Sequence, residues 1–399
     1  MEESKPKKKG ALLPKLFAAI AIGILVGYVS PDWLIRVLNC FRDTFGQFIK
    51  FIVPFIIVGL VTPAIIDTGR SAGRMLLMTI GIAWVSTVVF GYFAYGVSAT
   101  VFPRIIDAAA LGDLASVKTF PAYFALKIPP VMDVVTSLVV ALVVGFGSIA
   151  IKSEILAKGA DELRRVVMLT LKHAFVPFLP LYILSVIADL TASGKLGVVG
   201  GSSVRIMAMA MATTTSVLII QFCIAGAIAG KNPFRCLWNM MSAYLTGWGC
   251  CSSAATIPYT MDCTRRNGVS EETTSLVIPL CSSMHMAGSM ANVVVYSAGL
   301  LVLMGQGLPF ANYTEYILMV SFVAVASPGV PGGVVLATSA IAESALGFTP
   351  ERYAIMIALY LALDGMGTAC NLTGDGAIAL IVDRFHRPSS RTQAPSSRP

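Results

Sequence analysis

The chain has 399 residues, of which 56% are hydrophobic and only 13% are charged, and its mean hydropathy is +0.78. This composition excludes an ordinary soluble domain and indicates a membrane protein. The net charge of +8 comes mostly from short basic stretches beside apolar segments, and this placement does not favour nucleic-acid binding. The eight cysteines have no C-x-x-C spacing that would favour a metal site or a disulfide framework.

Both ends of the chain are basic. Five lysines lie between positions 5 and 15, and four arginines lie between positions 384 and 398, most of them in the tail 386–399, which is rich in Pro and Ser and is expected to be disordered. Because Lys and Arg accumulate on the cytoplasmic side of a membrane, we expect both termini in the cytoplasm, an even number of crossings and a location in the plasma (inner) membrane.

Apolar stretches long enough to cross a bilayer, about 20 residues as helix, recur along the chain. We expect about eight spanning helices plus additional apolar material, drawn from segments near 11–30 and 44–66, Met75–Pro103, segments near 120–151 and 174–189, Ile206–Gly230, Thr273–Thr314, Tyr316–Ala342 and a segment near 353–382.

Two apolar segments, 232–262 and 311–347, carry helix breakers at their centres. The first has Gly247, Gly249 and Pro258, and the second has the run "SPGVPGG" at 327–333. A helix broken in lipid must satisfy its free backbone groups with protein or a water-lined cavity. We interpret each segment as a re-entrant hairpin, with a kinked helix as the alternative. Such paired segments are typical of secondary transporters with inverted repeats.

The helix between these segments, "PLCSSMHMAGSMANVVVYS" at 279–297, carries polar groups in mid-span, and Gly288 permits local unwinding there. A single histidine such as His285 is more often a satisfied core residue than a ligand, so both interpretations stay open.

The last helix has one polar face. Asp364, Thr368, Asn371 and Asp375 lie at offsets of 0, 4, 7 and 11, and at about 100° per residue their side chains fall within about 60° of each other. A carboxylate at bilayer depth costs at least about 2.5 kcal/mol and normally marks a substrate or ion pathway. The sequence therefore predicts the functional site on this face.

Four motifs in order give a resemblance to a known family. They are "IKFIVPFIIVGLVTP" followed by "GRSAGR", the hairpin tip "SSAATIP", the second tip "GVPGG" and "DGMGTACNLTGD" in the last helix. Together they resemble the dicarboxylate/amino acid:cation symporters, which include the glutamate transporters, over nearly the whole chain. The resemblance implies an all-α polytopic membrane protein with eight transmembrane helices plus two re-entrant helical hairpins, and a transporter rather than an enzyme.

The resemblance also implies roles for single residues. Asp364 matches the carboxylate that binds the substrate amino group, Thr368 and Asn371 match groups that hydrogen-bond the substrate, and Ser253 matches a ligand of its carboxylate. The substrate site implied in this way comprises Asp364, Thr368, Asn371, Ser253, Gly367, Val330, Gly333 and Ser289, with Val330 and Gly333 in the gating tip of the second hairpin. The sodium site implied in this way comprises Asp375, Asn371, Cys281 and His285.

Three departures from the family pattern limit this transfer. Gly367 stands where acidic amino acid transporters have an arginine, and Cys251 at the aligned hairpin position supplies none, so we expect a small neutral amino acid rather than an acidic one. Ala287 replaces an aspartate that binds an ion in the family, and Tyr360 replaces an acid found in many relatives. His285 can instead carry a proton. Sodium is the favoured coupling ion, and a proton is the alternative.

By resemblance, residues 71–103 and 196–385 form a mobile transport domain, residues 1–70 and 104–195 form a scaffold, and the assembly is a homotrimer in the lipid bilayer that works by alternating access. An acidic amino acid or C4-dicarboxylate symporter coupled to protons remains an alternative. A non-transporting receptor is a more distant one. An intramembrane enzyme with Ser253 as nucleophile lacks a recognisable base.

Overall fold

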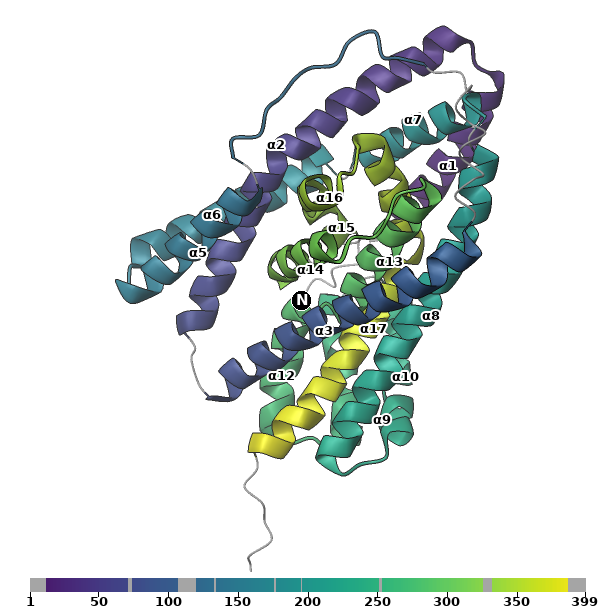
Figure 1. Ribbon diagram of the computed structural model, residues 1–399. Helices are drawn as coiled ribbons and strands as arrows, with labels where there is room; N and C mark the ends of the chain where they lie inside the picture. The colour runs from purple at the N-terminus through teal and green to yellow at the C-terminus, as the bar shows by residue number, and fades with distance from the viewer. Residues whose placement is uncertain are drawn as a thin grey trace, which may run out of the picture.

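The computed structural model describes residues 12–70, 74–106, 120–132, 134–175, 177–194, 196–250, 253–325 and 332–386. Every regular element within these ranges is helical, which confirms the all-α prediction (Figure 1). Val330 of the predicted gate and the tail from 387 onward lie outside the described residues.

The first half of the chain contains α1 (Leu12–Val29), α2 (Asp32–Arg70), α3 (Arg74–Ile105), α5 (Val134–Ala150), α6 (Glu154–Thr170), a short π-helical turn η2 (Leu171–Phe175) and α7 (Leu179–Ala192). The second half contains α8 (Leu196–Ala229), α9 (Pro233–Asn239), α10 (Met241–Cys250), α11 (Ser253–Arg266), α12 (Glu271–Met284), α13 (Ala287–Leu303), α14 (Phe310–Val325), α15 (Gly333–Ala337), α16 (Ser339–Leu346) and α17 (Pro350–His386).

Four helical segments of the described chain are long and apolar enough to cross a membrane: Arg74–Ile105, Gly200–Ala229, Glu271–Leu303 and Arg352–His386. The bent pair Glu154–Ala174 and Leu179–Ala192 would make a fifth. The eight predicted crossings therefore stay a prediction. Of the segment predicted near 120–151, only 134–150 is helical. Residues 120–132 form no regular element and begin beside α2, where the amide of Asn39 donates to the carbonyl of Phe120 at 2.6 Å (Figure 1). Pro129 and Pro130 disfavour a helix at the end of this stretch.

The helices pack in two groups. In the first, α1 lies against α7, and α2 lies against α5, α6 and α7. A Cβ atom at Gly23 would lie only 2.9 Å from the carbonyl oxygen of Leu184, so the glycine permits the close approach of α1 to α7. In the second group α3, α8 and α17 surround α13.

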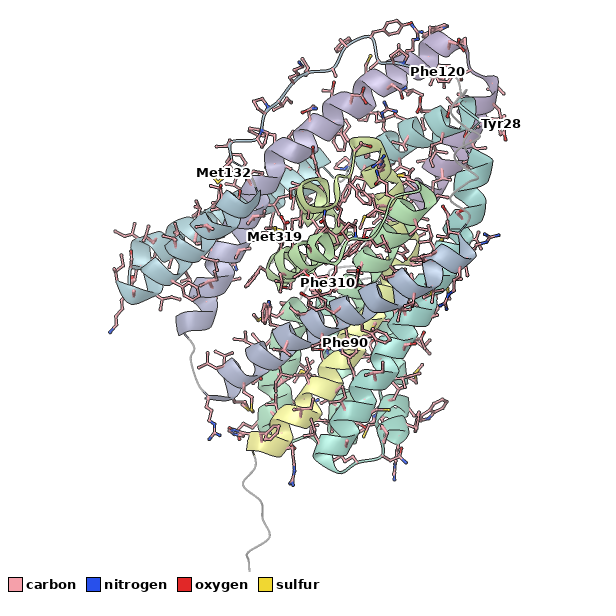
Figure 2. All side chains as sticks on the ribbon, in the orientation of Figure 1. Tyr28, Phe90, Phe120, Met132, Phe310 and Met319 are labelled. Carbon is pink, nitrogen blue, oxygen red and sulfur yellow. The ribbon has the colours of Figure 1, made fainter. Side chains whose placement is uncertain are left out.

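Helix α13 is the centre of the core, since each residue from Ala287 to Leu303 is buried. Its sequence is apolar on nearly all sides, as expected for a helix enclosed by other helices. Aromatic rings of α3 and α14 pack together beside this core. Phe310, which is labelled in Figure 2, begins α14. Its ring lies 6.0 Å from the ring of Tyr92 and 5.7 Å from that of Tyr95. A polar side chain on α13 is therefore shielded from solvent by its neighbours.

The two segments predicted as hairpins form helical pairs. Helices α10 and α11 pack on each other and on α17, and α14 packs on α16. A Cβ atom at Gly247 would clash with the side chain of Leu372, so this glycine brings α10 close to α17. The sequence predicted unwinding at Gly288. The break between α12 and α13 falls slightly earlier, at His285 and Met286.

Candidate functional site

A polar seam lies between α13 and α17, which run antiparallel. Ser289 of α13 contacts Asn371 of α17. Tyr296, about two turns further along α13, contacts Tyr360, about three turns earlier along α17. Between these two contacts, the amide of Asn292 lies against Gly367. The polar face predicted on the last helix is thus buried against the unwound start of α13.

Asn371 caps the start of α13. Its Oδ1 atom accepts hydrogen bonds from the backbone N–H groups of Gly288 at 2.8 Å and Ser289 at 3.2 Å, and its Nδ2 atom donates to the Ser289 hydroxyl at 2.9 Å. A helix start leaves such N–H groups without partners unless a side chain accepts from them. Asn371 therefore holds the unwound segment in place, in addition to any contact with a ligand.

Four predicted ion-site residues converge on the same break. The Nδ1 atom of His285 lies 3.0 Å from Oδ1 of Asp375 and 3.3 Å from the carbonyl oxygen of Asn371, and the backbone N–H of His285 donates to the carbonyl of Cys281 at 2.8 Å. Both neighbours of Nδ1 are acceptors, so we assign the proton of the ring to this nitrogen. The His285 ring thus holds the Oδ1 atom of the buried Asp375 carboxylate in place.

Sequence reasoning missed two members of this cluster. Nε2 of His285 lies 3.0 Å from the amide nitrogen of Gln221 on α8 and 3.2 Å from the hydroxyl of Ser86 on α3, and Gln221 donates to Ser86 at 3.1 Å. Ser86 and Gln221 each lie in a long apolar segment that also holds other hydroxyl side chains, so the sequence did not single them out. A small cavity of about 320 Å³, otherwise mostly apolar, borders Ser86 and Gln221.

Asp364 lies where α17 meets the second hairpin. The backbone N–H of Gly332 donates to its Oδ2 atom at 2.8 Å, and Tyr360 precedes Asp364 by about one turn of α17. Gly332 has a left-handed φ of 75° and precedes Gly333, the first residue of α15. The carboxylate is thus in direct contact with the described end of the predicted gate.

Thr368 and Ser253 are buried, at 8% and 9% exposure, and Ser253 begins α11, which packs on α17. In the part of the chain that the structure describes, neither side chain hydrogen-bonds another predicted site residue. The structure therefore brings Asp364, Asn371, Ser289 and Gly367 together along the seam, whereas it links Ser253 to them only through the packing of its helix.

The electrostatics of the seam are unusual, because two carboxylates are buried with little positive charge. Asp364 is 5% exposed and Asp375 is fully buried. Within the described ranges, neither pairs with Lys or Arg, and the Oδ2 atom of Asp375 has no hydrogen-bond partner. A buried carboxylate without a partner is costly unless a cation joins it. The seam is therefore suited to bind positive charge at both positions.

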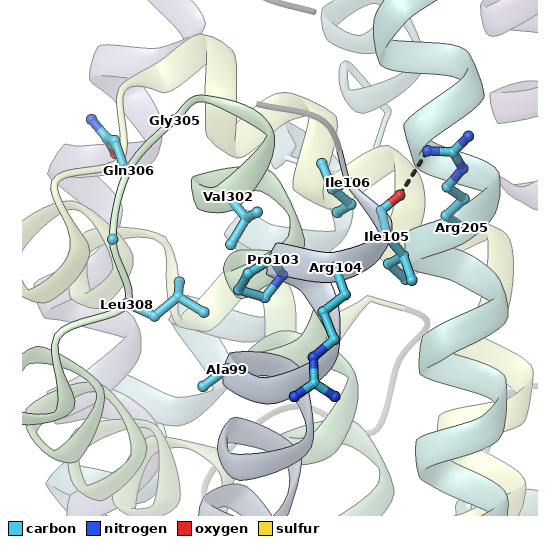
Figure 3. A pocket seen from close by; sticks show the side chains of 11 residues that line it. Ala99, Pro103, Arg104, Ile105, Ile106, Arg205, Val302, Gly305, Gln306 and Leu308 are labelled. Atoms are coloured by element: carbon cyan, nitrogen blue, oxygen red, sulfur yellow. Dashed lines mark hydrogen bonds between the residues drawn. The ribbon is translucent and has the colours of Figure 1, made fainter. Parts of the chain in front are cut away.

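A separate cavity of about 890 Å³ lies where α3, α8 and the end of α13 meet (Figure 3). Arg104 and Arg205 line it, and Arg205 donates to the carbonyl of Ile105 at 2.7 Å. Its lining includes none of the residues predicted to bind substrate or ion, so the candidate site is the seam.

Comparison with known proteins identifies the family of the chain. The family described as "Sodium:dicarboxylate symporter family" matches residues 12–385. The serine/threonine transporter SstT of Acinetobacter baylyi is 22% identical over 94% of this chain and 97% of its own length. SstT of Streptococcus thermophilus is 25% identical over 82% of this chain and 83% of its own. The neutral amino acid transporter B(0) of Mus musculus is 30% identical over 41% of this chain and 30% of its own.

Proposed function

This chain belongs to the sodium:dicarboxylate symporter family, and from that premise we propose that it takes up a small neutral amino acid together with sodium, by alternating access. The family consists of transporters, so an intramembrane enzyme built on Ser253 is excluded. One observation carries the choice of substrate. The carboxylate of Asp364 is buried, and the residue at position 367 on the same helix is a glycine, which brings no positive charge.

Asp364 is the proposed partner of the substrate amino group. An ammonium group beside a desolvated carboxylate forms a strong, charge-assisted hydrogen bond. It would compete with the N–H of Gly332, which now donates to Oδ2 at 2.8 Å. Binding of substrate and the position of the second hairpin are linked in this way, as a gate requires.

The absence of a guanidinium group at Gly367 supports a neutral side chain. A second carboxylate on the substrate would enter a site that already contains Asp364, with no Arg or Lys from the described residues to pair with it. Two buried like charges without a counter-ion are strongly unfavourable. The names of the relatives, serine/threonine transporter and neutral amino acid transporter, agree with this choice.

The residues at Asp375 fit a sodium ion. The unpartnered Oδ2 atom is the observation that supports this fit, and hard cations prefer oxygen ligands such as this carboxylate and the carbonyls of Cys281, His285 and Asn371. When bound, sodium would supply the positive charge that the buried carboxylate lacks. His285 holds the other carboxylate oxygen and so orients the site.

The two packing groups support the proposed division of labour. Helices α1, α2, α5, α6 and α7 would form the scaffold, and α3 with α8 to α17 would form the transport domain that carries the seam. We further propose that the scaffold forms a homotrimer. The protein would lie in the plasma (inner) membrane, with both termini in the cytoplasm.

The proposal is tested by uptake into proteoliposomes. We expect accumulation of a labelled small neutral amino acid that needs an inward sodium gradient, and we expect Asp364→Asn to abolish it, because the amide cannot neutralise the ammonium. Thr373→Val, on the same helix, serves as the control. Undiminished uptake by Asp364→Asn would refute the amino-group assignment. Uptake driven by a proton gradient without sodium would refute sodium coupling, and binding without uptake would favour a receptor.

A further inference from the structure

We propose that Asn292 and Tyr296 form the subsite for the substrate side chain, and that this subsite selects an uncharged side chain with a hydrogen-bond acceptor, such as a hydroxyl or an amide. The inference rests on the proposed function and adds to it, since it distinguishes polar from purely aliphatic neutral substrates. Neither residue belongs to the substrate site that the resemblance implied.

Both residues face α17 from one side of α13. Ser289, Asn292 and Tyr296 are spaced at i, i+3 and i+7, which places them on one helix face. Ser289 hydrogen-bonds Asn371 at 2.9 Å, and the ring of Tyr296 lies 6.2 Å from that of Tyr360 in an edge-to-face arrangement. Asn292, between them, must point at the same part of α17.

Both residues bring a buried donor that has no acceptor. Asn292 is 1% exposed and Tyr296 is fully buried, and neither the Nδ2 atom of Asn292 nor the hydroxyl of Tyr296 has a partner among the described residues. Buried polar groups are normally paired, so two unpaired donors on one helix face require an explanation. A ligand that accepts from both provides one.

The two donors border the amino-group site. A Cβ atom at Gly367 would lie 2.8 Å from Nδ2 of Asn292, so the amide lies directly on the backbone of α17 at that glycine. Gly367 is three residues from Asp364, which corresponds to about 4.5 Å along the helix. The ring of Tyr296 lies 6.2 Å from that of Tyr360, which precedes Asp364 by about one turn of α17. This spacing suits a small amino acid that reaches Asp364 with its ammonium and Asn292 with its side chain.

The chemistry of the donors sets the selectivity. An amide N–H and a phenol O–H donate to a hydroxyl or carbonyl oxygen, but they bring no positive charge to balance a carboxylate. An aliphatic side chain leaves both donors unpaired, and a site built to hydrogen-bond its substrate discriminates strongly against an analogue that cannot. Serine should therefore bind more tightly than alanine.

The test compares the affinities of the purified full-length protein for serine and alanine, measured by calorimetry in sodium. In the parent we expect serine to bind about 10-fold more tightly than alanine, as expected when a buried donor is left unpaired. Leucine has nearly the same shape as asparagine. In Asn292→Leu the ratio of serine affinity to alanine affinity should therefore fall to about 1, while the affinity for alanine is retained. Tyr296→Phe removes only a hydroxyl and should reduce the preference in the same direction.

An unchanged serine-to-alanine ratio in Asn292→Leu and Tyr296→Phe, with both amino acids still bound, would overturn the inference and leave the proposed function intact. If Asn292→Leu does not fold, the ratio in Tyr296→Phe decides alone. Binding of aspartate and of no neutral amino acid by the parent protein would overturn the proposed function, and this inference with it.

Discussion

Replacing Asn371 with alanine should destabilise the protein even when no ligand is present. Its Oδ1 atom accepts from the N–H groups of Gly288 and Ser289 at 2.8 and 3.2 Å, and the residue is only 4% exposed. Alanine would leave two buried N–H groups without an acceptor, at about 1–3 kcal/mol each. We therefore expect Asn371→Ala to lower the free energy of unfolding by about 2–6 kcal/mol.

The assay is unfolding of the purified protein in mild detergent, without sodium or amino acids, so that lost ligand binding does not contribute. Thr373→Val is the matched control on the same helix. Thr373 is fully buried, and its hydroxyl has no partner in the described chain, so removing the hydroxyl should leave stability unchanged or raise it slightly. Equal stability of Asn371→Ala and parent, or equal losses in the two variants, would refute the reasoning.

Two further substitutions test how α17 is anchored. Asp383 accepts hydrogen bonds from the N–H and the hydroxyl of Ser270 at 3.1 and 2.5 Å. Asp383→Ala should therefore lower the free energy of unfolding by about 2–4 kcal/mol in the same assay. An unchanged unfolding transition would contradict this anchor. Gly288→Ala would place a Cβ atom 2.6 Å from that of Cys370, so it should separate α13 from α17, cost about 1–3 kcal/mol and reduce uptake. Gly96→Ala, which meets no atom within 4 Å, is its control, and equal uptake by both variants would contradict the close packing.

The helical membrane class and the family could be predicted from the sequence, because they depend on properties of short segments. Apolar length gave the helical class, and four local motifs gave the resemblance that the match over residues 12–385 confirms. The polar face of α17 was also predictable, since the spacing of Asp364, Thr368, Asn371 and Asp375 fixes their common direction within one helix.

The break before α13 was predicted only approximately. The sequence pointed to Gly288, the residue most able to unwind, whereas the structure breaks at His285 and Met286. The reason lies in the tertiary structure. Asn371 of α17 accepts a hydrogen bond from the N–H of Gly288, and this bond stabilises Gly288 within the first turn of α13.

The sequence by itself determined that two carboxylates share one face of an apolar helix, and that no arginine lies beside them at Gly367. Only the tertiary structure decided what they face. Ser86 reaches His285 across 199 residues of chain, Gln221 reaches it across 64, and Asn292 meets Gly367 from another helix. Helical periodicity fixes the direction of a side chain on its own helix, but the partner it meets depends on how whole helices pack, which no local spacing encodes.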